Sequence, residues 1–146
     1  MDGKLFLGTA KFLINNGLDE AAFRSAVSRA YYACFLEARK TAFAYCDKNV
    51  RFKDGIKNEK DVRHEPLAEY FKVSDDQSIR QLGEDLSGLR RSRQKADYVM
   101  ESSIQIDDAK DVVDQAELFL EEIADKDPTD IGKAMENYLS RIYGLS

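Results

Sequence analysis

The fold of this chain is decided by residues 79–100, which read IRQLGEDLSGLRRSRQKADYVM. Apolar residues recur there in alternating steps of three and four, which places them on one face of a helix: Ile79, Leu82, Leu86, Leu89, Ala96 and Met100. Position 93 falls on the same face but is an arginine. A charged guanidinium on an apolar face is costly unless it is paired or opens onto a pocket or partner. The stretch therefore predicts both a buried helix and a candidate site.

Helical spacing extends through most of the chain and predicts further helices over 4–16, 19–46, 65–72, 107–125 and 128–144. The first of these is expected to bury Leu5 and Phe12 on its apolar side. Residues 47–63 are charged and lack the spacing, which predicts a solvated loop. Because no segment shows strand alternation, we expect an all-α fold, an antiparallel bundle of about five helices plus a short extra C-terminal helix.

The ends of these helices have recognisable capping residues. Gly17 suits the position after the first helix, and Asp19 can cap the second. Four more residues form two start signals, a capping box before the helix of residues 79–100 and an N-cap with a first-turn proline before the last helix: Ser74 with Gln77, and Asp127 with Pro128.

The length and composition limit the classes of protein to which the chain can belong. A length of 146 residues suits one domain, with a bundle over 1–126 and residues 127–146 as a helical extension of the same domain. The 22 Lys and Arg against 27 Asp and Glu argue against a general nucleic-acid coat, but not against a local basic site. Two cysteines twelve residues apart in one helix are interpreted as reduced, which fits a cytoplasmic protein. The single histidine excludes a multi-histidine metal site, we expect no cofactor, and no apolar run is long enough to predict a membrane span.

Two interpretations of Arg93 follow from its neighbours. In the first, the side chain extends from the end of the apolar face and pairs with Asp97, one turn later. In the second, it is an anion site, because a planar guanidinium matches phosphate oxygens and Tyr98 can donate a hydrogen bond or stack on a base. Basic neighbours could add to phosphate binding: Arg90, Arg91 and Lys95.

Two stretches of the sequence resemble a known family. AAFRSAVSRAYYACFLEARKTAF (21–43) together with RQKADY (93–98) is similar to the HEPN domain, an all-helical module of prokaryotic toxin–antitoxin and antiviral systems. The resemblance covers about residues 5–124. It implies a homodimer that brings the arginine motifs of two protomers into one cleft. Many members are metal-independent endoribonucleases, in which the motif arginine steadies the scissile phosphate and a histidine helps the 2′-hydroxyl attack it.

The resemblance assigns roles to particular residues. Arg93 matches the motif arginine, and Gln94 takes the position often held by a polar residue after it, which makes it an RNA-binding candidate. Arg29 in the first stretch becomes a secondary RNA-binding candidate. The histidine position holds Tyr98, preceded by Asp97, and a tyrosine with a pKa near 10 is a poor base at neutral pH. His64 could supply an imidazole from elsewhere, or be a surface residue at the start of a short helix. The resemblance therefore implies RNA or nucleotide binding and leaves cleavage open.

Two other functions remain open from the sequence. In the family a common partner is a small nucleotidyltransferase, which in some systems modifies a tyrosine near the motif, so Tyr98 is the candidate here. The domain could instead be an oligomerisation unit without a ligand. Of Tyr31 and Tyr32, one is expected in the core and the other is a candidate for the dimer groove. Arg24 lies outside the apolar stripe and is interpreted as solvated, and Ser28 has no base nearby in the sequence.

Overall fold

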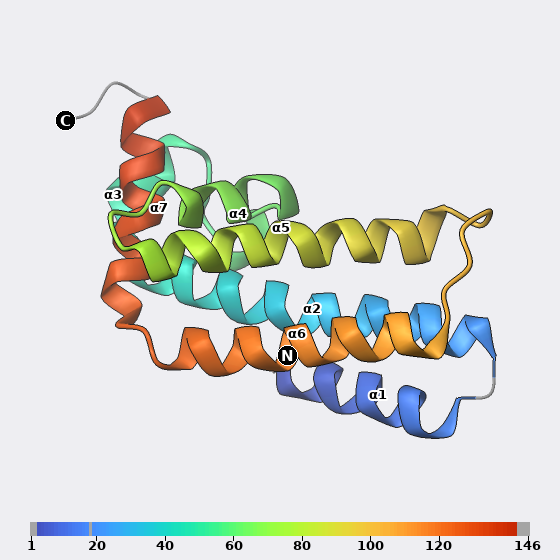
Figure 1. Ribbon diagram of the computed structural model, residues 1–146. Helices are drawn as coiled ribbons and strands as arrows, with labels where there is room; N and C mark the ends of the chain where they lie inside the picture. Colours follow the sequence, from blue (N-terminus) through green and yellow to red (C-terminus); the bar gives the residue numbers. More distant parts are fainter. Residues whose placement is uncertain (1–2, 18, 143–146) are drawn as a thin grey trace. The chain divides into compact units, whose positions relative to one another are not determined.

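The computed structural model describes residues 3–17 and 19–142, and every regular element within these ranges is helical, as predicted (Figure 1). Seven α-helices and one short 3₁₀ helix follow one another there: α1 (Gly3–Asn16), α2 (Glu20–Tyr45), α3 (Lys48–Lys53), η1 (Glu59–Asp61), α4 (His64–Lys72), α5 (Gln77–Tyr98), α6 (Ile106–Ala124) and α7 (Pro128–Ile142). The end predicted for the last helix, near Tyr143 and Gly144, lies outside the described residues. No helix of the described ranges is long and apolar enough to cross a membrane.

The chain divides into two compact units. The first comprises Met1–Glu37 and Asp85–Glu121, and the second comprises Ala38–Glu84 and Glu122–Ser146. Each unit has a core of its own, because each combines several helical segments that bury apolar side chains.

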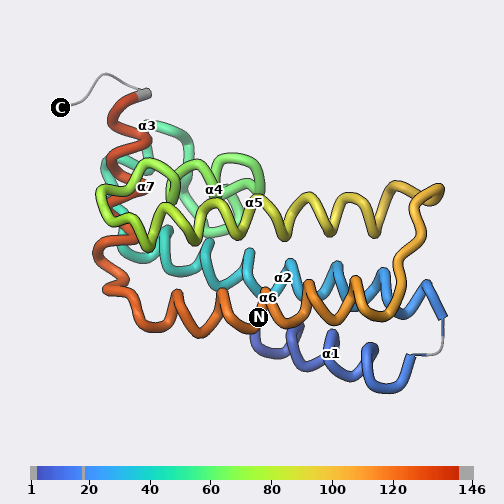
Figure 2. The backbone as a smooth tube through the Cα atoms, in the orientation of Figure 1, coloured from blue at the N-terminus to red at the C-terminus, as the bar shows by residue number. Residues whose placement is uncertain are grey.

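The first unit packs α1, the first part of α2, the second part of α5 and most of α6 (Figure 2). Gly3 of α1 lies against α2 so closely that a Cβ atom there would be 2.5 Å from the carbonyl oxygen of Ala33. Lys11 of α1 pairs with Glu117 of α6, with 2.9 Å between Nζ and Oε1. The core between these helices consists of small and aromatic side chains: Ala10, Ala26, Ala30, Tyr31, Cys34, Phe35, Leu86, Leu89, Ala109, Ala116 and Phe119.

The second unit is built around α4 and α7. Helix α7 packs on α4 and α3, and the rings of Tyr70 and Tyr138 meet edge to face with centroids 5.1 Å apart. Gly132 of α7 lies directly against the backbone of Tyr45, where a side chain would have no room. The buried apolar residues of this unit come from α2, α4, α5, α7 and the segments beside η1: Ala42, Ile56, Val62, Leu67, Ala68, Tyr70, Phe71, Ile79, Leu82, Ile131, Met135 and Leu139.

The predicted loop over 47–63 was wrong in part, because it contains α3 and η1. Asp47 begins α3 by accepting hydrogen bonds from the amides of Asn49 and Val50, at 2.9 and 3.2 Å. Arg51 lies over the ring of Phe43, with Cζ 3.9 Å from the centroid, and is buried. These stabilising contacts are a local cap and a tertiary stacking, neither of which produces apolar periodicity.

Other helix ends were predicted with mixed success. Gly17 follows α1 and Asp19 Oδ1 accepts a hydrogen bond from the Ala22 amide, as expected. The last helix begins at Pro128, and its cap is Asp127 Oδ1, which accepts from the Thr129 amide at 3.0 Å. The capping box at Ser74 was wrong, because α5 begins only at Gln77 and Asp76 Oδ1 accepts from the Ser78 amide at 2.8 Å.

Three apolar residues expected on buried faces are exposed. Leu5 and Phe12 of α1 are each 63% exposed, and Met100 is 71% exposed. Helix α5 ends at Tyr98, so the helical spacing that placed Met100 on the apolar face no longer applies to it. Arg93 of the same face is mostly buried, with 16% of its side chain exposed.

Candidate functional site

The candidate site surrounds Arg93 near the end of α5, within the first compact unit. Its Nη2 donates a hydrogen bond to the hydroxyl oxygen of Tyr32 on α2, at 2.9 Å. Its Nε lies 2.9 Å from Asp97 Oδ2, which confirms the predicted pairing one turn along the helix. The Nε–H bond is not aligned with that oxygen, so this contact is an ion pair without a hydrogen bond. Among the described residues, none accepts a hydrogen bond from Nη1 of Arg93.

Two aromatic rings flank the same guanidinium. The Cζ atom of Arg93 is 5.3 Å from the ring centroid of Tyr32 and 5.4 Å from that of Tyr98. Both distances are within the range of cation–π attraction. Tyr98 is 68% exposed, whereas Tyr32 is partly buried. The arginine is therefore held on one side by α2 and covered on another by an exposed ring.

The Asp97 carboxylate joins α5 to α2 as well. Its Oδ2 accepts a hydrogen bond from Ser28 Oγ at 3.3 Å, in addition to the ion pair with Arg93. Ser28, which has no base nearby in the sequence, thus donates to a carboxylate of another helix. One carboxylate oxygen consequently receives both of these contacts.

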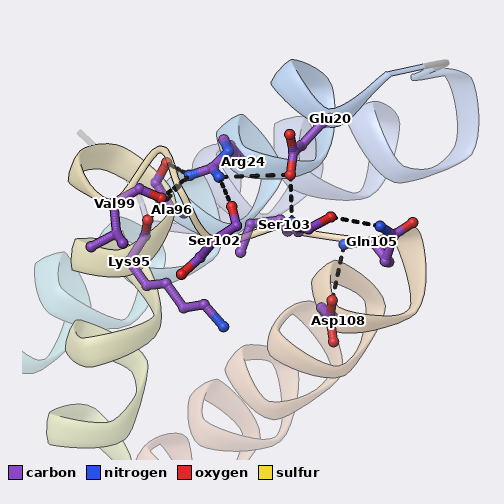
Figure 3. Close-up of polar contacts among 10 residues, drawn as sticks. Glu20, Arg24, Lys95, Ala96, Val99, Ser102, Ser103, Gln105 and Asp108 are labelled. Carbon is purple, nitrogen blue, oxygen red and sulfur yellow. Dashed lines mark hydrogen bonds and ion pairs between the residues drawn. The ribbon is translucent and has the colours of Figure 1, made fainter.

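Arg24 holds the end of α5 in place (Figure 3). Its Nη1 donates to the carbonyl oxygens of Lys95, Ala96 and Val99, at 3.1, 2.9 and 3.2 Å, and its Nη2 donates to that of Ser102. Lys95 and Ala96 belong to the last turn of α5, whereas Val99 and Ser102 follow it, and the Lys95 and Val99 oxygens also accept from the amides of Val99 and Ser102. A cation is favourable at this end of a helix. Arg24 is only 9% exposed, so its interpretation as a solvated residue was wrong.

Glu20 extends this arrangement to the connection between α5 and α6. Its Oε1 accepts a hydrogen bond from the Ile104 amide at 2.5 Å and lies 3.6 Å from Arg24 Nη2. Figure 3 shows Glu20 and Arg24 side by side above this connection. The start of α6 is capped separately, because Asp108 Oδ2 accepts from the Gln105 amide at 2.9 Å.

Tyr31, the neighbour of Tyr32, belongs to the core as expected for one of the pair. It is fully buried, and burial raises its pKa above the ordinary range, while the charges of Arg90 and Arg93 oppose that rise. The phenol is therefore neutral at physiological pH and cannot act as a base there.

The other predicted residues are placed differently. Arg29 is exposed on α2, and its Cζ lies 5.7 Å from the ring centroid of Phe6. Arg91 and Lys95 are exposed on α5, whereas Arg90 and Gln94 are partly buried there. His64 is the first residue of α4 and belongs to the second compact unit, whereas Arg93 belongs to the first. The structure thus brings Arg93, Asp97 and Tyr98 together within the first unit.

Four residues of α2 complete this region, and only Tyr32 had been a candidate. Their sequence signal is a strict four-residue spacing, which aligns side chains along one face of a helix: Glu20, Arg24, Ser28 and Tyr32. Ser28 and Tyr32 contact side chains of α5, whereas Arg24 and Glu20 contact the backbone at and after the end of α5. A polar row of this kind could have indicated the face on which α2 meets a second polar segment.

The described residues contain no group of three or more His, Cys, Asp or Glu side chains suited to a metal ion. The site therefore consists of a guanidinium, a carboxylate and two phenols, which together can bind an anion and stack on a planar group. No protein-family model, curated protein or solved structure matches this chain.

Proposed function

We propose that this chain is a HEPN-type protein whose homodimer binds RNA, with Arg93 contacting a phosphate in a cleft shared by the two protomers. The proposal includes the antiparallel bundle with a short extra C-terminal helix that the sequence pattern predicts. The proposal rests on one observation, that the Arg93 guanidinium is oriented by its neighbours but keeps one nitrogen, Nη1, without an acceptor in the described part of the chain. Tyr32 and Asp97 orient it, while none of the described residues accepts a hydrogen bond from Nη1.

The surroundings of Arg93 suit a single-stranded RNA. An oriented guanidinium donates to phosphate oxygens with little further loss of side-chain freedom. The exposed ring of Tyr98 offers a face on which an unpaired base can stack. Arg91 and Lys95, exposed on the same helix, add positive charge that attracts the RNA backbone.

Cleavage is a separate question from binding. It would require a base that takes the proton of a 2′-hydroxyl while that oxygen attacks phosphorus and the 5′-oxygen leaves. Tyr98 is a poor base at neutral pH, and Asp97 is already engaged by Arg93 and Ser28. We therefore propose binding as the function and test cleavage beside it.

Fluorescence anisotropy with a labelled single-stranded RNA tests the proposal, and a denaturing gel of the same RNA tests cleavage. We expect Arg93→Ala to weaken binding by about tenfold or more, the effect of one charge-assisted contact. Arg93→Lys should weaken it less, because it keeps the charge. Arg141→Ala, at an exposed arginine of α7, is the matched control and should bind like the natural protein.

Equal binding by the natural protein and a folded Arg93→Ala variant would overturn the RNA proposal. If that variant instead changed only stability or self-association, the chain would be an oligomerisation unit. Sedimentation at tens of micromolar tests the dimer, and a monomer at that concentration would contradict the shared cleft.

The exposure of Tyr98 favours one second candidate, a binding module that is modified by a partner nucleotidyltransferase. The phenol oxygen would attack the α-phosphate of a nucleoside triphosphate, and pyrophosphate would leave. A nucleotidyltransferase gene beside this one would support the pairing. Incubation with that enzyme and triphosphate should add a nucleotide mass to the natural protein but not to Tyr98→Phe; unchanged mass in both would exclude it.

A further inference from the structure

The second compact unit contains a cavity of about 660 Å³ that the proposed RNA site does not use. It lies between the turn after α3, the η1 segment, the start of α4 and one residue of α7, Tyr138. This volume falls within the range of small-molecule pockets.

The walls of the cavity are set by local hydrogen bonds. Gly55 has a φ of +74°, a conformation that favours glycine, and the next amide, of Ile56, donates to the carbonyl of Arg51 at 3.0 Å. Asp61 Oδ2 accepts hydrogen bonds from the amides of Lys57 and Asn58, both at 2.9 Å. The cavity is thus bounded by a hydrogen-bonded turn, and the Oδ2 atom of Asp61 is already bonded to the amides of Lys57 and Asn58.

A buried tyrosine, Tyr70, lines this cavity. Tyr70 is 1% exposed, and its hydroxyl makes no hydrogen bond to any residue in 3–17 or 19–142. Burial raises the pKa of Tyr70 above its ordinary range, so the group stays protonated and can donate. A hydroxyl that lines a cavity and has no protein partner can donate to a ligand or solvent acceptor there.

Two basic side chains line the same cavity. Lys60 and Arg63 are exposed, and neither forms an ion pair or hydrogen bond with another described residue. The pKa of Asp61 is lowered mainly by the hydrogen bonds from the Asn58 and Lys57 amides, and less by the charges of Lys57 and Arg63. Arg63 is also the N-cap of α4, and its side chain gives that helix end no capping hydrogen bond. The positive end of a nine-residue helix therefore adjoins two uncommitted cations.

Two exposed carboxylates, Asp54 and Glu65, also line the cavity and limit the negative charge it can accept. A polyanion such as RNA would be repelled by them, whereas one anionic group can lie beside the cations. The apolar part of the lining comes from Ile56, Pro66 and the ring of Tyr138.

We propose that this cavity binds a small ring-bearing organic molecule with one anionic group, a carboxylate or a phosphate monoester. The anionic group lies near Lys60 and Arg63, where it can also accept from the Tyr70 hydroxyl. The ring packs against Ile56, Pro66 and Tyr138. A ligand of this size is expected to bind with a Kd on the order of 1 mM.

Calorimetric titration of the full chain tests this site with four probes: phenyl phosphate, benzoate, inorganic phosphate and phenol. We expect phenyl phosphate or benzoate to bind at least roughly tenfold more tightly than phosphate or phenol, because only the first two combine ring and charge. Which of those two binds more tightly identifies the anionic group.

Variants locate the binding and separate it from the RNA site. Arg63→Ala and Tyr70→Phe should each weaken the better probe by about fivefold or more, whereas Lys133→Ala, at an exposed lysine of α7, should not. Arg93→Ala should leave it unchanged, so failure here and failure of RNA binding are distinguishable. Absence of binding by all probes up to about 10 mM, or equal binding by natural protein and Arg63→Ala, would overturn the proposal.

Discussion

Arg93 of α5 donates a hydrogen bond from Nη2 to the hydroxyl of Tyr32 on α2, at 2.9 Å, while its Cζ lies 5.3 Å from the same ring. One tyrosine thus supplies both a polar and an aromatic contact to the guanidinium. This double contact orients the charge that we propose binds phosphate.

Tyr32→Phe removes the hydroxyl and keeps the ring. We expect it to lower the free energy of unfolding by about 1 kcal/mol and to weaken RNA binding severalfold, because the hydroxyl no longer helps to orient Arg93. Urea denaturation and RNA anisotropy measure the two effects. If RNA binding were unchanged while stability fell, the hydroxyl would serve the fold alone.

Arg24→Ala leaves four carbonyl oxygens at and beyond the end of α5 without the donor that Arg24 supplies. We expect the free energy of unfolding to fall by about 2 kcal/mol or more, since a buried guanidinium and its four hydrogen bonds are lost, although the Lys95 and Val99 oxygens keep a backbone donor. Arg29→Ala on the same helix is the control, because Arg29 is exposed and should change stability by less than about 0.5 kcal/mol. Similar effects of the two variants would show that the Arg24 hydrogen bonds contribute little.

Two glycine-to-alanine substitutions should have opposite effects on stability. At Gly132 a new methyl group would collide with the backbone of Tyr45, so we expect a decrease of about 1–3 kcal/mol. At Gly88 the nearest atom to a new Cβ is the end of Arg91, at 3.7 Å, an ordinary van der Waals distance. Alanine there should raise the free energy of unfolding by about 0.5–1 kcal/mol, as in any helix interior. Thermal melts that shift in the same direction for both would contradict this packing.

Stability should fall in alkaline solution through Cys46. Burial and the nearby Glu136 carboxylate raise the pKa of this thiol from 9.0 to about 12, so the folded protein keeps a proton that the unfolded chain loses. Its contribution is therefore complete below pH 9.0 and is lost as the pH rises towards about 12. Unfolding titrations should show a shallower alkaline decline for Cys46→Ala than for the natural protein. Parallel declines would mean that the thiol is not protected by folding.

The helical fold could be predicted because apolar periodicity records burial along each helix. It worked for α5 from Ile79 to Ala96, and it failed at Met100, where the helix had already ended. It also missed α3, which depends on the Asp47 cap and on Arg51 stacking over Phe43. Such contacts involve single residues and leave no period in the sequence.

Only the part of the candidate site that lies on a single helix could be predicted from the sequence. Arg93, Asp97 and Tyr98 lie four and five positions apart, so their proximity follows from helical geometry. Tyr32 and Arg24 come from α2, and local spacing does not say which face of α2 meets α5. The contacts of both residues depend on how α2 packs beside α5, which the sequence pattern does not specify.

The salt dependence of RNA binding tests the central claim, that Arg93 contacts a phosphate, most directly. Each phosphate neutralised on single-stranded RNA contributes about 0.7 to the slope of log Kd against log salt concentration. We predict that Arg93→Ala reduces this slope by about 0.7 for each phosphate that Arg93 neutralises, while Arg141→Ala leaves it unchanged. Equal slopes and equal affinities for the natural protein and Arg93→Ala would contradict the account.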